Sequence, residues 1–141
     1  MMYRHRRLLA GLVVGFLVVV VAAAAFRLSP LWPGPSVPPG ATRLALATEP
    51  AHLVPAFGCA TAELAPGRIA VAGGALVLVA QPSGTPLDVV WPSGWAAWTA
   101  DGRAVLVTRD GALVGRQGDL IQGFAGGVGV DDAFHVCDLG S

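Results

Sequence analysis

The sequence contains no Lys and no Asn, so all nine of its basic residues are Arg. A chain that lacks both and is rich in Ala, Gly, Val and Pro indicates a GC-rich bacterial genome. The absence of Asn also excludes N-glycosylation. At 141 residues, the chain has room for one folded domain and a targeting segment.

Positive charge is scarce beyond the N-terminus. Residues 28–141 contain five Arg against nine Asp and Glu, a net charge of about −4. A negative domain is poorly suited to binding nucleic acid or an anionic membrane surface. We therefore expect no nucleic-acid partner.

The N-terminus has the composition of a membrane-targeting segment. Residues 1–7 form a basic tip, and Leu8–Phe26 are nineteen residues without a charged or polar side chain. As a helix this run would be roughly 28 Å long, close to the bilayer's hydrocarbon thickness of about 30 Å. Because Arg stays on the cytoplasmic side, we predict a transmembrane signal anchor over residues 8–27. The protein would be single-pass in the bacterial cytoplasmic membrane, with its C-terminal domain outside.

A cleaved signal peptide is the alternative interpretation of the same segment. Ala22–Ala25 would supply the small residues that a signal peptidase needs, and the protein would then be secreted. The apolar run is longer than the usual core of such a peptide, which favours the anchor. In both cases the rest of the chain lies outside the cytoplasm.

Residues 28–41 are rich in Pro, which excludes a helix and weakens a sheet. We interpret them as an extended linker that leads to a folded domain at 42–141. There, short β-branched runs alternate with Gly and Asp turns, and Asp-Gly pairs are typical of tight hairpins. The runs expected to be strands are 68–72, 75–80, 87–91, 103–109, 112–116 and 120–124.

Turn signals at this spacing predict an all-β domain. We expect a small closed β-barrel, since closure would protect the edges of such apolar strands. An immunoglobulin-like sandwich is the alternative.

A set of turn motifs carries a resemblance to known sequences. Trp91-Pro92-x-Gly94, Asp101-Gly102, Asp110-Gly111, Gly118-Asp119 and Phe134-His135-Val136-Cys137 resemble a loose group of uncharacterised bacterial exported proteins. The resemblance implies an OB-like barrel that pairs an early Cys with a late one. It implies no activity, because the group has none established.

The two cysteines of the chain, Cys59 and Cys137, flank most of the predicted strands. In an oxidising compartment two such cysteines usually form a disulfide, worth roughly 4.5 kcal/mol for a loop of this length. The alternative is a metal or nucleophile site that combines the thiolates with His52 and His135. The sequence contains no closely spaced CxxC pair to support that site.

Trp91, Trp95 and Trp98 form the aromatic concentration of the domain. Exposed, they would form a surface for stacking on sugars or peptides; buried, they would anchor a small core. On a continuous strand, Trp91 and Trp95 share one face and Trp98 lies on the other.

Asp131 and Asp132 follow a glycine-rich run over 126–129. Adjacent carboxylates point to opposite sides of a strand and do not form the alternating ligand loop that calcium needs. We interpret them as a solvated turn.

These observations predict a non-enzymatic binding or structural module of the bacterial envelope, with no cofactor. Its expected partners are the membrane, through residues 8–27, and either an envelope protein or a cell-wall glycan. The alternative is an exported enzyme or metal-binding domain that uses His52, His135, Cys59 and Cys137.

Overall fold

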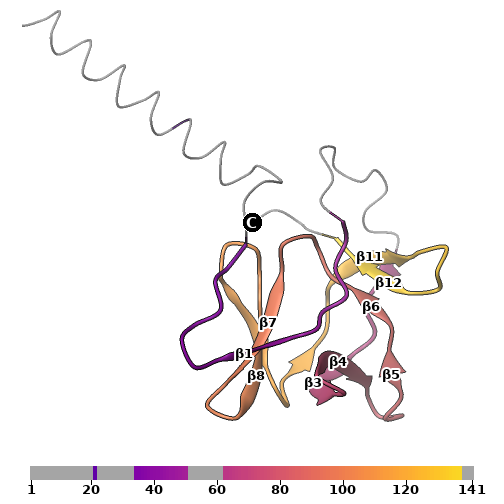
Figure 1. Ribbon diagram of the computed structural model, residues 1–141. Helices are drawn as coiled ribbons and strands as arrows, with labels where there is room; N and C mark the ends of the chain where they lie inside the picture. Colours follow the sequence, from indigo (N-terminus) through magenta and orange to yellow (C-terminus); the bar gives the residue numbers. More distant parts are fainter. Residues whose placement is uncertain (1–20, 22–33, 51–61, 138–141) are drawn as a thin grey trace, which may run out of the picture. The chain divides into compact units, whose positions relative to one another are not determined.

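The computed structural model describes Val21, residues 34–50 and residues 62–137. The chain divides into two units, Met1–Trp32 and Pro33–Ser141. In the described part of the second unit the regular structure is all β, which confirms the predicted class (Figure 1). No helix among the described residues has the length and hydropathy needed to span a bilayer. The predicted anchor at 8–27 lies outside them except for Val21, and it stays a prediction.

Among the described residues, twelve strands form three four-stranded sheets. The first sheet has the order β1 (Thr42–Leu44), β7 (Ala96–Ala100), β8 (Arg103–Val107), β9 (Leu113–Arg116). The second has the order β10 (Leu120–Ile121), β3 (Gly67–Ala72), β4 (Ala75–Ala80), β5 (Pro86–Leu87). The third has the order β2 (Ala62–Glu63), β11 (Ala125–Val128), β12 (Phe134–Val136), β6 (Val89–Val90). All neighbours are antiparallel except β12 and β6.

The two longest hairpins follow directly from local sequence. β3 and β4 pair in register on either side of Gly73-Gly74, and β7 and β8 pair on either side of Asp101-Gly102. Asp101 has a φ of 51° and Gly102 a φ of 74°. Positive φ at both central residues is what a tight right-twisted hairpin requires, and Asp and Gly tolerate it.

Two segments join the sheets by backbone hydrogen bonds. The β9–β10 connection spans the first two sheets: Gln117 N–H donates to Ala104 O (2.8 Å) and Gly118 N–H to Ile69 O (2.9 Å). The residues after β1 continue to the other sheets, where Leu76 N–H donates to Ala45 O (3.0 Å) and Trp91 N–H to Ala47 O (2.9 Å). The stretch 42–49 therefore contacts all three sheets.

One main hydrophobic core lies between the sheets and draws side chains from each of them. Its buried members are Leu44, Leu64, Ile69, Leu76, Leu78, Trp91, Trp95, Ala97, Ala104, Leu106, Ile121 and Val136. Ala104 and Leu106 in β8 are completely inaccessible to solvent. Burial of this apolar surface is the main driving force for folding of the domain.

A second, smaller cluster covers the opposite face of the first sheet. It consists of Ala96, Trp98 and Val107, with Val37 and Ala41 packed against them. Residues 34–41, part of the stretch interpreted as a linker, thus contribute apolar side chains to the folded unit.

The closed barrel predicted from the sequence is wrong: none of the three sheets closes on itself among the described residues. The strands are too short and change partners too often. The run predicted as one strand at 87–91 divides at Asp88, since β5 pairs with β4 and β6 pairs with β12. The chain therefore passes from one sheet to the next instead of continuing around a cylinder.

Candidate functional site

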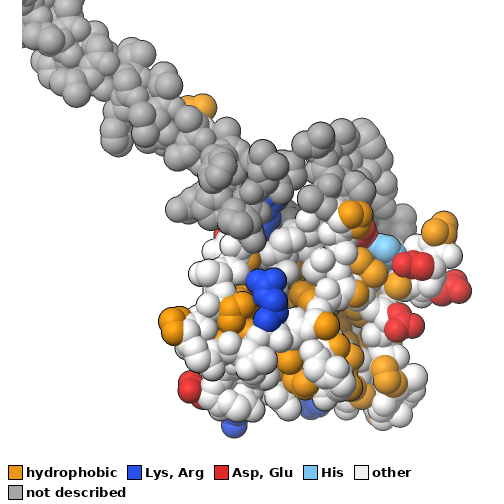
Figure 2. All heavy atoms as spheres, in the orientation of Figure 1, with side chains coloured by type: hydrophobic (Ala, Val, Ile, Leu, Met, Phe, Trp, Pro, Cys, Tyr) orange, Lys and Arg blue, Asp and Glu red, His pale blue; other side chains and the backbone are white. Residues whose placement is uncertain are grey.

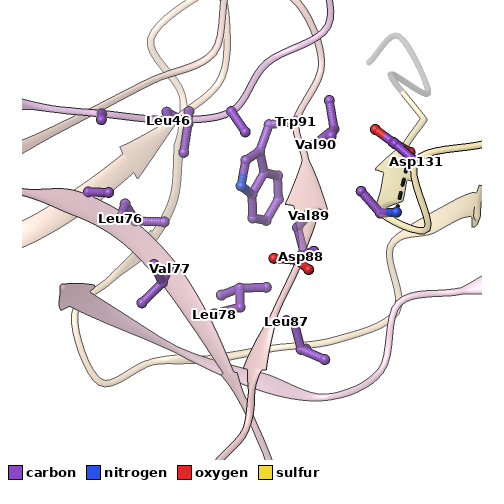
Figure 3. Close-up of a pocket in the computed structure, with 14 residues that line it drawn as sticks. Leu46, Leu76, Val77, Leu78, Leu87, Asp88, Val89, Val90, Trp91 and Asp131 are labelled. Atoms are coloured by element: carbon purple, nitrogen blue, oxygen red, sulfur yellow. Dashed lines mark hydrogen bonds between the residues drawn. The ribbon is translucent and has the colours of Figure 1, made fainter. Parts of the chain in front are cut away.

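A hollow opens where the second and third sheets separate at Asp88. It has a volume of about 480 Å³, within the range of small-ligand pockets. We call it the strand groove; it is lined by residues 45–47 after β1, 75–78 of β4, 87–91, Asp131 and Ala133. In Figure 3 the Trp91 ring lies at the centre of this arrangement, with Leu46, Leu78 and Val89 around it.

The lining of the strand groove is aliphatic apart from Trp91 and two carboxylates. The carboxylates belong to Asp88, between β5 and β6, and Asp131, in the β11–β12 turn. We call this pair the acidic rim. Both residues are exposed; in Figure 3 Asp88 lies beside Val89, and Asp131 lies farther from Trp91, beyond Val90.

Charge is unevenly distributed over the described residues. None of the five Arg residues lines the strand groove; they lie at positions 43, 68, 103, 109 and 116, on or beside the first two sheets. Figure 2 shows acidic side chains gathered around a histidine on one side of the visible face. Among the described residues, the side chains that line the groove therefore include two carboxylates and no basic group.

His135 in β12 connects two carboxylates from distant parts of the chain. Its Nδ1 contacts Glu49 Oε1, and its Nε2 lies 2.9 Å from Asp131 Oδ1. A neutral imidazole has only one N–H, so the two carboxylates match the doubly protonated, charged form. We call these three residues the His135 cluster. It fixes the segment after β1 and the β11–β12 turn, both of which contribute to the groove.

The electrostatics agree with this geometry. Hydrogen bonds to Glu49 and then to Asp131 raise the pKa of His135 above its ordinary value, against a smaller effect of burial. The hydrogen bond from His135 is the main cause that lowers the pKa of Asp131. The side chains of His135 and Glu49 are about one-third exposed, so the cluster remains accessible to solvent protons.

Two glycines make the close packing of β11 and β12 possible. A Cβ on Gly126 would overlap the carbonyl oxygen of His135 and lie 2.5 Å from Cε1 of Phe134. A Cβ on Gly129 would overlap the His135 ring and lie 2.6 Å from Oδ1 of Asp131. Because both residues lack a Cβ, the backbone can lie close to the side chains of the His135 cluster and its neighbours.

The three tryptophans expected to form either a core or a ligand surface are buried. Trp91 and Trp95 stack with ring centroids 5.4 Å apart and belong to the main core. Trp98 belongs to the cluster on the other face of β7, as the spacing predicts. Their exposed fractions of 2%, 9% and 8% favour the packing role; Trp91 alone lines the groove.

The residues of the alternative metal or nucleophile site are only partly described. His52 and Cys59 lie outside the described residues, so the Cys59–Cys137 disulfide stays a prediction. Cys137 is buried at the end of β12. Both nitrogens of His135 face carboxylates. Among the described residues, no group of three or more His, Cys, Asp or Glu side chains is arranged to hold a metal ion.

Comparisons with protein-family models, curated proteins and solved structures find no match for this chain. The resemblance to exported OB-like proteins therefore remains untested, and the functional argument depends on the site itself.

Proposed function

We propose that this protein is a membrane-anchored, extracytoplasmic binding module of the bacterial envelope, without enzymatic activity. Residues 8–27 anchor it in the cytoplasmic membrane, and the β domain binds an envelope component outside. The strand groove with its acidic rim is the observation that carries the binding role. Open apolar hollows with a few polar groups are the usual form of binding sites.

The proposed membrane location and orientation depend on the sequence of the N-terminus. A basic tip before nineteen apolar residues supports an N-in, C-out orientation. Protease added to spheroplasts should remove a C-terminal epitope, and carbonate should fail to extract the chain from membranes. An epitope that is protected until the cells are lysed would contradict this orientation.

The binding role is tested by photo-cross-linking in intact cells. A photoreactive amino acid replaces Val77 on the groove wall, or Ala112 in the exposed turn between β8 and β9 as the matched control. We expect a discrete adduct from position 77 only, lost when Ala47→Arg fills the groove. Equal adducts at both positions, or none at position 77, would refute a binding role for the groove.

A further inference from the structure

The chemistry of the strand groove indicates what kind of ligand it takes, given the proposed binding function. Its walls are aliphatic, from Leu46 on one side to Val77 and Val89 on the others. Among the described residues, the one aromatic ring that lines the groove is Trp91, which is 2% exposed and so offers almost no face for stacking on a sugar ring. Aliphatic side chains of a polypeptide fit this lining better than a glycan does.

The acidic rim specifies the charge of that ligand. Asp88 is exposed next to the apolar wall, and no side chain among the described residues pairs with it. Asp131 Oδ1, by contrast, lies 2.9 Å from His135 Nε2 and accepts a hydrogen bond from the Ala133 N–H (3.3 Å). His135 compensates the charge of Asp131, and no Arg among the described residues lines the groove to compensate that of Asp88. Complementarity of charge therefore favours a ligand with a positive group adjacent to its apolar part.

We infer that the strand groove binds a short extended segment of an envelope protein, in which apolar side chains are followed by an Arg or Lys. The apolar residues lie against the walls formed by 45–47, 75–78 and 87–91, and the cation lies at the acidic rim. Apolar contact supplies most of the affinity, and the charge supplies orientation and selectivity.

The test uses the full chain in nanodiscs of zwitterionic phosphatidylcholine, so that lipid charge does not hold the probe. The probe is a capped, fluorescently labelled Leu-Val-Leu-Arg peptide, and polarisation reports binding. Two matched peptides, Leu-Val-Leu-Glu and Ser-Gly-Ser-Arg, remove the cation or the apolar part in turn. Empty nanodiscs measure the background.

Variants of the protein locate the site. Ala47 is exposed and lines the groove, so Ala47→Arg puts a bulky cation into it and should weaken binding by roughly tenfold or more. Val77→Arg does the same from the opposite wall, in case the first variant does not fold. Asp88→Asn should weaken binding by roughly threefold. Ala112→Arg and Asp101→Asn, in exposed turns away from the groove, should leave binding unchanged.

Saturable binding of the Arg peptide that both groove variants abolish would support the inference. Binding that survives Ala47→Arg and Val77→Arg would overturn the assignment to the groove. Equal binding of the Glu peptide, binding of a wall-glycan fragment instead, or no binding of any peptide would overturn the ligand class. The proposed function fails separately, if groove-specific cross-links are absent in cells.

Discussion

Two sheets of the same domain are stabilised by different means. The β1-β7-β8-β9 sheet has apolar clusters on both faces, with β8 completely buried at Ala104 and Leu106. The β2-β11-β12-β6 sheet has strands of two to four residues and depends on glycine for close packing and on the His135 cluster for its attachment. The β1-β7-β8-β9 sheet is therefore stabilised by packing on both faces. The β2-β11-β12-β6 sheet contributes fewer side chains to the core and depends in addition on specific contacts beside the strand groove.

The largest expected effect comes from the predicted disulfide, which involves Cys137 at the end of the β2-β11-β12-β6 sheet. If Cys59 and Cys137 are bonded, reduction should lower the free energy of unfolding by about 4 kcal/mol. Because Cys137 follows β12, the β2-β11-β12-β6 sheet should loosen first. Intact mass with and without reductant, followed by urea titration of the full chain in micelles, measures both effects.

The double variant Cys59→Ser/Cys137→Ser is the control and should behave like the reduced wild type. Two alkylatable thiols in the unreduced, denatured chain would contradict the disulfide.

Substitutions of Gly126 in β11 and of Gly115 in β9 compare how well the two sheets tolerate an added Cβ. A Cβ on Gly126 meets backbone and the Phe134 ring, whereas one on Gly115 would lie 2.9 Å from the flexible ends of Ile69 and Ile121. We expect Gly126→Ala to cost about 3 kcal/mol and Gly115→Ala about 1 kcal/mol, because side-chain ends can move and a paired backbone cannot. Urea titration followed by tryptophan fluorescence measures both. A larger loss of unfolding free energy in Gly115→Ala than in Gly126→Ala would contradict this difference between the sheets.

The His135 cluster should make stability depend on pH. Folding raises the pKa of His135, so its stabilisation is complete below the ordinary value of 6.5 and is lost as pH rises through the folded-state pKa. Folding lowers the pKa of Asp131, so its stabilisation is present above 3.8 and is lost as pH falls through the lowered pKa. The cluster should therefore stabilise the fold most between pH 3.8 and 6.5.

His135→Gln should cost about 1 kcal/mol in that window, discounted for solvent exposure, and should cost less at alkaline pH. Thermal unfolding across a pH series of both proteins checks this. If the stability of His135→Gln depended on pH as that of the wild type does, His135 would not contribute to the stability of this sheet.

Arg109 lies in the connection between β8 and β9, and no carboxylate among the described residues pairs with its guanidinium. Its Nε and Nη2 are buried without a hydrogen-bond partner among the described residues. Arg109→Met keeps much of the aliphatic stem beside Gly94 and removes the desolvated charge, which should raise stability by about 1 kcal/mol. Arg103→Met, on the exposed start of β8, should change stability by less than about 0.5 kcal/mol. A loss of stability in Arg109→Met would show that the guanidinium has a stabilising partner.

The same contrast explains what could be predicted from the sequence. The β3–β4 hairpin was predictable because two β-branched runs on either side of Gly73-Gly74 are a local signal. For the second hairpin the sequence indicated the Asp101-Gly102 turn and β8, but β7 (Ala96–Ala100) was not among the predicted strands. β11 has Gly at two of its four positions and no alternation to detect. Glu49 and His135 are 86 residues apart, so nothing in the sequence pairs them, and Asp131 was interpreted only as a solvated turn. The closed barrel failed because the change of sheet at Asp88 has no local signature.

Hydrogen exchange of the full chain in nanodiscs, with and without the Leu-Val-Leu-Arg peptide, tests most directly whether the strand groove is the binding site. We expect the peptide to slow amide exchange over 45–47, 75–78 and 87–91 and to leave the β7–β8 hairpin unchanged. Protection confined to 96–107, or no protection at a saturating concentration of peptide, would contradict the account.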